Sequence, residues 1–213
     1  MDDRLALYEY PPTRSNRVKW ALEELDIAYE SVIVDLAAGA QNKPDYRSLH
    51  PLGRVPAVRS AHYSLFESVA IVMQLFDEHP DKGFAPEVGT ADRAAYYQWC
   101  VFAAAELDPA IMTVFDNAMR PLAAMRPPGR QHDPVAAQYG RVAFDECAQA
   151  LTAALGDGPY VLGERFSGAD IAVGHSCDMA RRVGLIDEFP VLLAYLDRLG
   201  ARPAHQRVYA RAT

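Results

Sequence analysis

Cysteine is scarce in this sequence of 213 residues, which contains only Cys100, Cys147 and Cys177. They are odd in number, widely spaced and without a CxxC pair, so they argue against a disulfide scaffold and fit a reducing compartment. The six histidines show no ligand spacing, and we expect no metal site.

Long apolar runs are also absent. No stretch approaches the roughly 18 to 20 consecutive apolar residues that span a bilayer. The sequence opens on Met1, Asp2, Asp3 and Arg4 with no apolar signal-peptide core behind them. We therefore expect a cytoplasmic protein without a membrane partner.

Basic residues are too few for a nucleic-acid binder. Lys and Arg number 21 against 28 Asp and Glu, which gives a net charge of −7. Nothing in this balance would neutralise a phosphate backbone, so we expect no nucleic-acid partner. Half of the residues are hydrophobic, and the chain is long enough for one large domain or two small ones with packed cores.

The first 80 residues carry strand and helix patterns in alternation. Residues 5–8 and 29–34 are short and β-rich, and residues 16–25 between them have the apolar spacing of an amphipathic helix. This order predicts a β-α-β unit. Two further short strands at residues 57–59 and 63–66 and an apolar helix from Ser68 to about Glu78 predict a ββα unit after it.

Beyond a breaker-rich segment at residues 79–89, only helical patterns remain. That segment contains Pro80, Gly83, Pro86 and Gly89 and indicates an interdomain linker. A helix should follow over residues 92–117 and be bent or interrupted at Pro109, because proline lacks an amide donor and crowds the preceding turn. Further helices are predicted over residues 133–155, 168–182, 190–199 and 203–210.

The clearest local motif is a capping box at Ser167 and Asp170. In this motif the serine side chain accepts from the aspartate amide, and the aspartate carboxylate accepts from the serine amide. Its role is structural. Asp133 followed by Pro134 predicts another helix start.

Three turns in the first 80 residues combine structural and ligand-binding signals. Val55-Pro56 precedes a strand; a trans bond is the ordinary case, and a cis bond would turn the Val55 peptide outward to hold an extended peptide. Glu67-Ser68 opens a helix; Ser68 is either a simple cap or, with the helix amides, a carboxylate site beside Glu67 as an ammonium site.

The third turn joins the first strand to the first helix, where ligands bind in α/β units. It carries two hydroxyls, on Thr13 and Ser15. Ser15 fits a helix N-cap, since the residues from Asn16 onward are helical. Thr13 lies earlier and is free to point away from the helix.

Taken together, these residues resemble the cytosolic glutathione S-transferases over essentially the full chain, in a bacterial-type pattern similar to the theta and zeta classes, which use a serine or threonine hydroxyl. The motifs occur in family order: a hydroxyl after the first strand, Arg17 early in the first helix, Val55-Pro56, Glu67-Ser68 and a late capping box. The resemblance implies an α/β thioredoxin-like N-terminal domain at residues 1–80. It also implies an all-α C-terminal domain at residues 90–213 and a homodimer.

The resemblance also implies which residues bind glutathione, the co-substrate. Val55 would pair with the cysteinyl backbone, with Pro56 cis behind it, and Glu67 and Ser68 would hold the γ-glutamyl end. Lys43 and Gln41 would face the glycyl carboxylate, and Arg54 belongs to the same set. Thr13 would stand where the theta- and zeta-like classes have serine, with Ser15 as the fallback.

The implied reaction is attack of the glutathione thiolate on a small hydrophobic electrophile, as in detoxification. No cysteine precedes Cys100, so a glutaredoxin-type reductase with its own nucleophilic cysteine is disfavoured. The electrophile pocket would lie between the Thr13 turn and the long helix, and each candidate for it has an equally good interpretation as core. The candidates are Tyr10, Trp99, Phe102, Glu106 and Met112.

Other functions remain open. Glutathione-dependent isomerisation, dehalogenation or peroxide reduction would use the same thiolate. A glutathione- or hydrophobic-ligand-binding protein without appreciable turnover would share the fold. A scaffold for protein assembly would bind no glutathione.

Overall fold

The computed structural model describes residues 4–119 and 131–209. The chain forms two compact units: Met1–Ala85 with Gly200–Thr213 (unit 1), and Pro86–Leu199 (unit 2). The predicted domain limits, residues 1–80 and 90–213, stay a prediction. In the structure the residues from Gly200 onward join unit 1 rather than the helical unit.

A four-stranded mixed sheet forms the centre of unit 1. Its strands are β1 (Leu5–Glu9), β2 (Tyr29–Ile33), β3 (Ala57–Arg59) and β4 (Ser64–Phe66), in the order β2-β1-β3-β4. β1 pairs parallel with β2 and antiparallel with β3, and β3 pairs antiparallel with β4. β1 is therefore an inner strand. Its Leu5, Ala6 and Leu7 are all buried, as expected of a strand covered on both faces.

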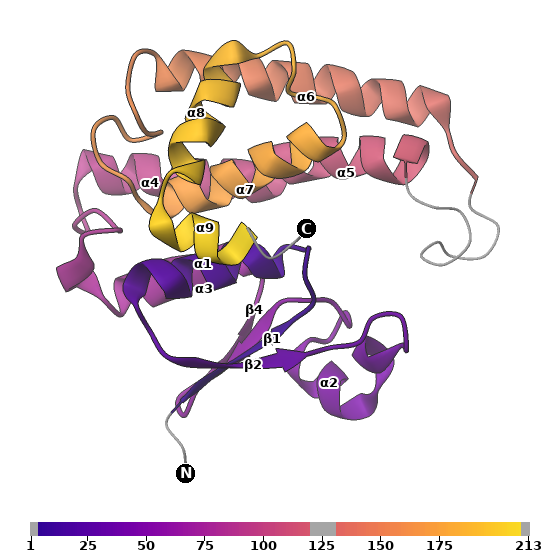
Figure 1. Cartoon of the computed structure of the whole chain (residues 1–213), viewed down its shortest axis with the longest axis vertical. Helices are drawn as coiled ribbons and strands as arrows, with labels where there is room; N and C mark the ends of the chain where they lie inside the picture. The colour runs from indigo at the N-terminus through magenta and orange to yellow at the C-terminus, as the bar shows by residue number, and fades with distance from the viewer. Residues whose placement is uncertain (1–3, 120–130, 210–213) are drawn as a thin grey trace. The chain divides into compact units, whose positions relative to one another are not determined.

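Two helices of unit 1 lie side by side on one face of the sheet, α1 (Ser15–Leu25) and α3 (Ser68–Asp77) (Figure 1). α1 buries Val18, Ala21, Leu22 and Leu25, as predicted, and also Trp20. The short α2 (Pro44–Leu49) lies away from this helical layer and follows a 3-10 turn at Ala40–Asn42. A 3-10 turn at Pro80–Lys82 lies in the segment predicted as a linker.

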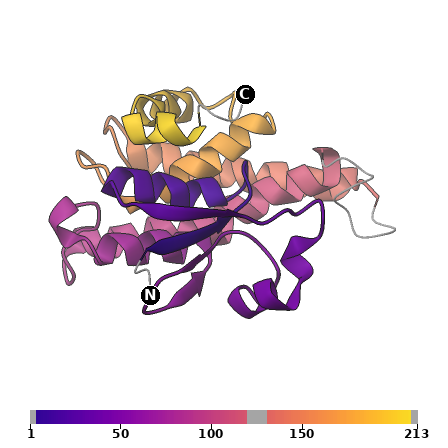
Figure 2. The ribbon, with the colours of Figure 1, turned by 60° about the horizontal axis from the view of Figure 1, so that its bottom comes forward.

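The last helix, α9 (Pro203–Tyr209), packs on α1 (Figure 2). Its His205 ring meets the Trp20 ring edge-on at a centroid distance of 4.7 Å. Arg202 and Arg207 form ion pairs with Glu24 and Glu23 of α1. The end of the chain is thus tied to the first helix.

Unit 2 is helical. Its helices are α4 (Ala91–Phe102), α5 (Asp108–Val114), α6 (Pro134–Leu155), α7 (Gly168–Arg182) and α8 (Pro190–Gly200). α7 is buried on nearly all sides and forms the core of the unit. α6 packs against α5 so closely that a Cβ at Gly140 would lie 3.0 Å from the Ala110 carbonyl oxygen, so this position needs glycine.

The predicted interruption at Pro109 is confirmed, and its form is π-helical. Residues Ala103–Leu107 form a π-helical segment, and α5 restarts at Asp108 with the proline in its first turn. Proline has no amide hydrogen and is tolerated there. A second π-helical segment, Phe115–Met119, follows α5.

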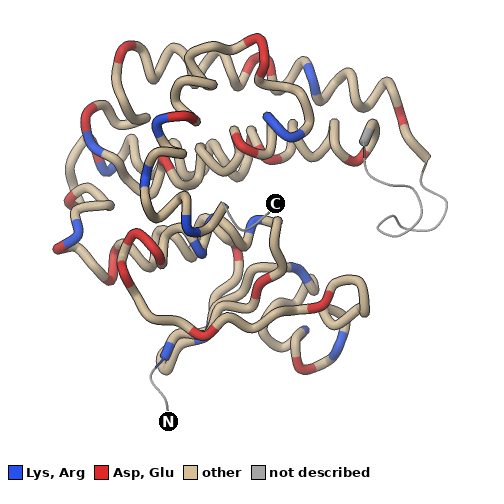
Figure 3. The backbone as a smooth tube through the Cα atoms, viewed as in Figure 1, with Lys and Arg blue, Asp and Glu red and all other residues tan. Residues whose placement is uncertain are grey.

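Acidic and basic residues are interspersed along the described parts of both units (Figure 3). No helix in the described residues is both long and apolar enough to cross a membrane.

Candidate active site at the starts of two helices

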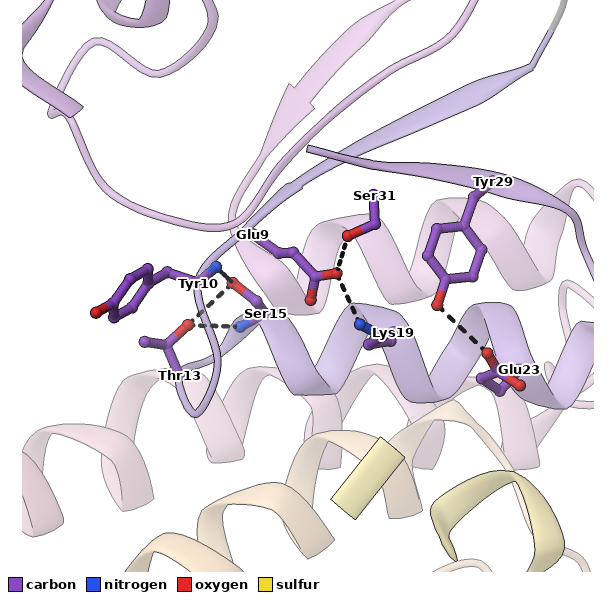
Figure 4. A network of polar contacts seen from close by, with 8 residues as sticks. All are labelled: Glu9, Tyr10, Thr13, Ser15, Lys19, Glu23, Tyr29 and Ser31. Carbon is purple, nitrogen blue, oxygen red and sulfur yellow. Dashed lines mark hydrogen bonds and ion pairs between the residues drawn. The ribbon is translucent and has the colours of Figure 1, made fainter. Parts of the chain in front are cut away.

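The turn between β1 and α1 is built around the hydroxyl of Ser15 (Figure 4). Ser15 is fully buried, and its Oγ accepts hydrogen bonds from the Tyr10 amide at 3.3 Å and from Thr13 Oγ1 at 2.9 Å. Thr13 Oγ1 in turn accepts from the Ser15 amide at 3.2 Å. Thr13 itself is only half-buried. The structure therefore brings the two predicted hydroxyls together, with Thr13 the more accessible.

The prediction that Ser15 is an N-cap is wrong. Ser15 is the first helical residue, and the N-cap position belongs to Arg14, which makes no side-chain cap bond. The reason is local: Thr13 Oγ1 already accepts the Ser15 amide, and the Ser15 hydroxyl turns back to the Tyr10 amide. The peptide bond between Pro11 and Pro12 in this turn is cis, a feature that the sequence analysis did not include.

The start of α3 is the second element of the site. Ser68 is the first residue of the helix, and Glu67 before it has a φ of 71°, a left-handed value that is costly for a residue other than glycine. The prediction that Ser68 caps the helix is wrong, because its Oγ accepts from Nη1 of the buried Arg17 at 2.9 Å. A buried guanidinium needs acceptors. The first amides of α3 therefore have no side-chain cap.

Val55 and Pro56 lie immediately before β3, and the bond between them is cis. The Arg54 carbonyl accepts from the Tyr46 hydroxyl at 2.5 Å, which anchors the peptide next to Val55. Burial, assisted by the neighbouring Tyr8, raises the pKa of Tyr46 to about 12, so its hydroxyl remains a donor. Within the described part of the chain, the backbone of Val55 makes no hydrogen bond in a turn or loop.

Gln41 and Arg54 are brought close by a tight turn at Gly53. Gly53 has a φ of 59°, and a Cβ there would lie 2.7 Å from the Gln41 carbonyl oxygen. Gln41 Nε2 donates to the Leu36 carbonyl, and its buried Oε1 has no partner among the described residues. Lys43 is exposed at the start of α2, and Arg54 is exposed as well.

His50 is a buried neighbour of this region that the sequence analysis missed. His50 is 3% exposed, and its ring centroid lies 4.8 Å from that of Phe66, the residue that precedes Glu67. Its Nδ1 has no partner in the described structure. Burial is the largest cause and lowers the pKa of His50. The negative charge of Glu67 raises this pKa, and the positive charges of Arg54 and Arg47 lower it. No local pattern marks a histidine in a loop as buried, so nothing in the sequence predicted it.

The predicted pocket residues divide between the two units. Tyr10 lies in unit 1. Trp99 and Phe102, on α4 in unit 2, pack on each other at a centroid distance of 5.1 Å. Glu106 is exposed and Met112 half-buried, also in unit 2.

The three cysteines are buried, and none of them forms a disulfide within the described residues. Burial raises the pKa of Cys177 to about 12, with Asp178 and Asp108 adding to the shift. The pKa of Cys147 is also raised, again chiefly by burial. No group of three His, Cys, Asp or Glu side chains suited to a metal ion occurs among the described residues.

The sequence matches two family models, one directly after the other along the chain. Residues 3–75 match the glutathione S-transferase N-terminal domain, and residues 76–198 match the glutathione S-transferase C-terminal domain. The chain belongs to the glutathione S-transferase family, a family of enzymes. The predicted fold class, a thioredoxin-like domain with an all-helical second domain, is confirmed.

Individual relatives cover nearly the whole chain. Glutathione S-transferase 3 of Zea mays is 30% identical over 199 residues, which is 91% of this chain and 87% of the relative. The disulfide-bond oxidoreductase YfcG of Escherichia coli is 26% identical, over 97% and 94% of the two chains. A Pseudomonas fluorescens glutathione transferase family member, solved with two glutathione bound, has a TM-score of 0.82 and 27% identity, covering 97% of this chain and 92% of its own.

Proposed function

We propose that this protein binds glutathione in unit 1 and uses the Thr13 hydroxyl to stabilise its thiolate for attack on a small hydrophobic electrophile. The observation that carries the proposal is the pair of hydroxyls at the start of α1, 2.9 Å apart, of which only Thr13 is accessible. This assignment follows the theta- and zeta-like pattern with threonine in place of serine.

The arrangement supports Thr13 as the donor to sulfur and Ser15 as its support. A hydroxyl can rotate, so two oxygens at 2.9 Å can share their proton in either direction. With the Tyr10 amide donating to Ser15 Oγ, the Ser15 hydroxyl can donate to Thr13 Oγ1. The Thr13 proton then points to the ligand. The positive end of α1 adds to the same effect.

The energy required is modest. A free thiol with a pKa of about 8.5 is only a few per cent ionised at neutral pH. Lowering that pKa by about two units takes roughly 2.7 kcal/mol of differential stabilisation. A hydrogen bond to a charged group, worth about 1.5–3 kcal/mol, and a helix terminus, worth about 0.3–1 kcal/mol, together supply this amount.

The remaining site residues support binding of the rest of the tripeptide. The backbone of Val55, which makes no hydrogen bond in a turn or loop within the described residues and has Pro56 cis behind it, suits the cysteinyl unit as an added strand. The uncapped amides of α3, with Ser68, suit the γ-glutamyl carboxylate, and exposed Glu67 suits its ammonium group. Gln41, Lys43 and Arg54 would face the glycyl carboxylate. The family supports a homodimer in the cytoplasm.

Reduction of disulfides is a second candidate, favoured by the similarity to the Escherichia coli oxidoreductase and to a structure with two glutathione bound. The bound thiolate would attack one sulfur of a small disulfide, form a mixed disulfide and release a thiolate. A second glutathione thiolate would then displace the other half as thiolate and form oxidised glutathione. This route needs no cysteine of the protein. Thiolate-dependent isomerisation and dehalogenation are further variants.

The test is calorimetric titration of glutathione into wild type, Thr13→Val, Thr13→Ser and Ser15→Ala, with conjugation of an aryl halide and reduction of 2-hydroxyethyl disulfide assayed on the same samples. We expect Thr13→Val to lower kcat/KM about 100-fold, as loss of a preorganised donor does, with the Kd nearly unchanged. Thr13→Ser should retain most activity.

Other outcomes assign other functions. Binding without either activity in wild type would make the protein a non-catalytic binder. No binding would reject the proposal and favour a scaffold. Equal turnover in wild type and Thr13→Val would reject the role of Thr13.

A further inference from the structure

A buried carboxylate lies directly behind the Thr13 turn. Glu9, the last residue of β1, is fully buried, and its Oε1 accepts from Lys19 Nζ of α1 at 2.7 Å and from Ser31 Oγ of β2 at 2.5 Å (Figure 4). Its Oε2 is also buried and has no partner among the described residues. One side chain thus joins three elements of unit 1.

This position is an unusual place for a charge. Side chains alternate along a strand, so Glu9 continues the row of Leu5 and Leu7, both of which are buried apolar residues. Removing a carboxylate from water is costly, and pairing the buried Glu9 with a half-buried Lys19 stabilises a fold little compared with apolar residues of the same volume. Stability alone therefore does not account for a charge at this position.

The two residues of the ion pair flank the Thr13 turn in the sequence. Glu9 immediately precedes Tyr10, where the turn begins, and Lys19 lies about one helical turn after Ser15, where it ends. Inside the turn, the side-chain bonds of Thr13 and Ser15 are between neutral groups. In the view of Figure 4, Ser15 stands between Thr13 and the ion pair.

We propose that the Glu9–Lys19 ion pair, supported by Ser31, is a positioning device that holds the Thr13 hydroxyl in place for the bound thiol. This inference rests on the proposed function and adds to it residues that do not touch glutathione. The contacts proposed for the cysteinyl backbone at Val55 and for the γ-glutamyl end at Glu67 and Ser68 do not involve the pair. Its loss should therefore lower kcat and leave the Kd for glutathione almost unchanged.

The direction in which the pKa of the bound thiol shifts in each single variant distinguishes a positioning role from a purely electrostatic effect of the charges. If the pair acted only through charge, Lys19→Met would leave a negative charge near the thiol and raise the pKa of the thiol, whereas Glu9→Gln would leave a positive charge and lower it. If the pair holds the turn, both substitutions misplace the hydroxyl. The pKa of the thiol then rises in both.

The experiment measures kcat, the Kd for glutathione and the ultraviolet absorbance of bound thiolate against pH. The variants are Glu9→Gln, Lys19→Met and the double variant, which leaves no unpaired charge if Lys19→Met alone fails to fold. The matched control is Glu23→Gln, because Glu23 lies one turn further along α1 and forms an ion pair with Arg207, away from the turn.

We expect kcat to fall about 10- to 100-fold in all three variants, as misplacement of a catalytic group by about 1 Å does. The Kd should stay within about twofold, and the double variant should be no worse than the singles because the pair acts as one unit. Glu23→Gln should match wild type.

Opposite pKa shifts in the two single variants, or an unchanged kcat, would overturn the inference. A wild-type protein that fails to bind glutathione or to form thiolate would instead overturn the proposed function. The two failures are thus distinguishable.

Discussion

The starts of α7 and α3 place a serine at nearly the same position but use it in different ways. At α7 the Ser167 hydroxyl accepts from the Ala169 amide, and the Asp170 carboxylate accepts from the Ser167 amide at 2.8 Å, so the predicted capping box is confirmed. At α3 the Ser68 hydroxyl is turned to Arg17, and the helix has no side-chain cap.

The first turn of α7 is thus bonded within the protein and serves stability, whereas the first turn of α3 keeps amides that a ligand could bind. Asp170 also accepts from the Val161 amide and the Tyr195 hydroxyl, both at 2.8 Å, so the polar groups around it are bonded. The start of α3 keeps its amides without a side-chain cap, beside a residue with φ of 71°. Incomplete bonding and a strained backbone are typical of functional sites.

The largest expected effect comes from removing the Asp170 carboxylate at the start of α7. Asp170→Ala should lower the free energy of unfolding by about 3–5 kcal/mol, because it leaves two buried amides and the Tyr195 hydroxyl without their acceptor. Urea unfolding measures it. Asp133→Ala is the control, since Asp133 is an exposed cap of α6 and should cost about 1 kcal/mol. Equal losses in the two variants would show that the network around Asp170 adds nothing beyond a cap.

A second prediction contrasts the two serines. Ser68→Ala removes one acceptor of the buried Arg17 guanidinium and a hydroxyl of the proposed γ-glutamyl site, so the Kd for glutathione should rise about tenfold, roughly 1.4 kcal/mol. Ser167→Ala should lower stability by about 1 kcal/mol and leave the Kd unchanged. Calorimetric titration of glutathione into both variants measures the Kd. An unchanged Kd in Ser68→Ala would contradict a role for Ser68 in glutathione binding.

The smallest effect concerns His50, beside the α3 start. Burial lowers the pKa of His50 in the folded protein below its unfolded value of about 6.5. Neutral His50 therefore contributes stability that is present above pH 6.5 and is lost as the pH falls through the folded-state pKa. The slope is at most about 1.4 kcal/mol per pH unit.

His50→Asn should remove this contribution and flatten the dependence of the unfolding free energy on pH below about 6.5. Urea unfolding at a series of pH values measures it. His62→Asn is the control, since His62 is exposed on the β3–β4 turn. Parallel pH profiles for wild type and His50→Asn would contradict the prediction.

Much of the fold could be predicted because the signals are local. The start of α6 at Asp133-Pro134, the α7 capping box and the apolar face of α1 each depend on residues within about one helical turn of one another. Family order then brought Thr13, Val55 and Glu67 into one expected site.

The rest depends on partners that are distant in the sequence. Ser15 and Ser68 fit caps when only their neighbours are considered, and the structure assigns Ser68 to Arg17, 51 residues away. Glu9 follows the predicted strand at residues 5–8, and no local pattern indicates that its carboxylate is bonded to Lys19 of α1 and Ser31 of β2. Periodicity alone cannot reveal such contacts, because it reports which face is apolar and not which polar atoms meet.

The buried cysteines have a consequence for the proposed reaction with electrophiles. Electrophiles that react with the glutathione thiolate also arylate protein thiols, and only the thiolate form reacts. All three cysteines are covered, and the thiol of Cys177, with a pKa of about 12, is essentially un-ionised at neutral pH. The protein should therefore resist covalent self-inactivation during turnover, and mass spectrometry after long incubation with an aryl halide should find the intact chain at its unmodified mass.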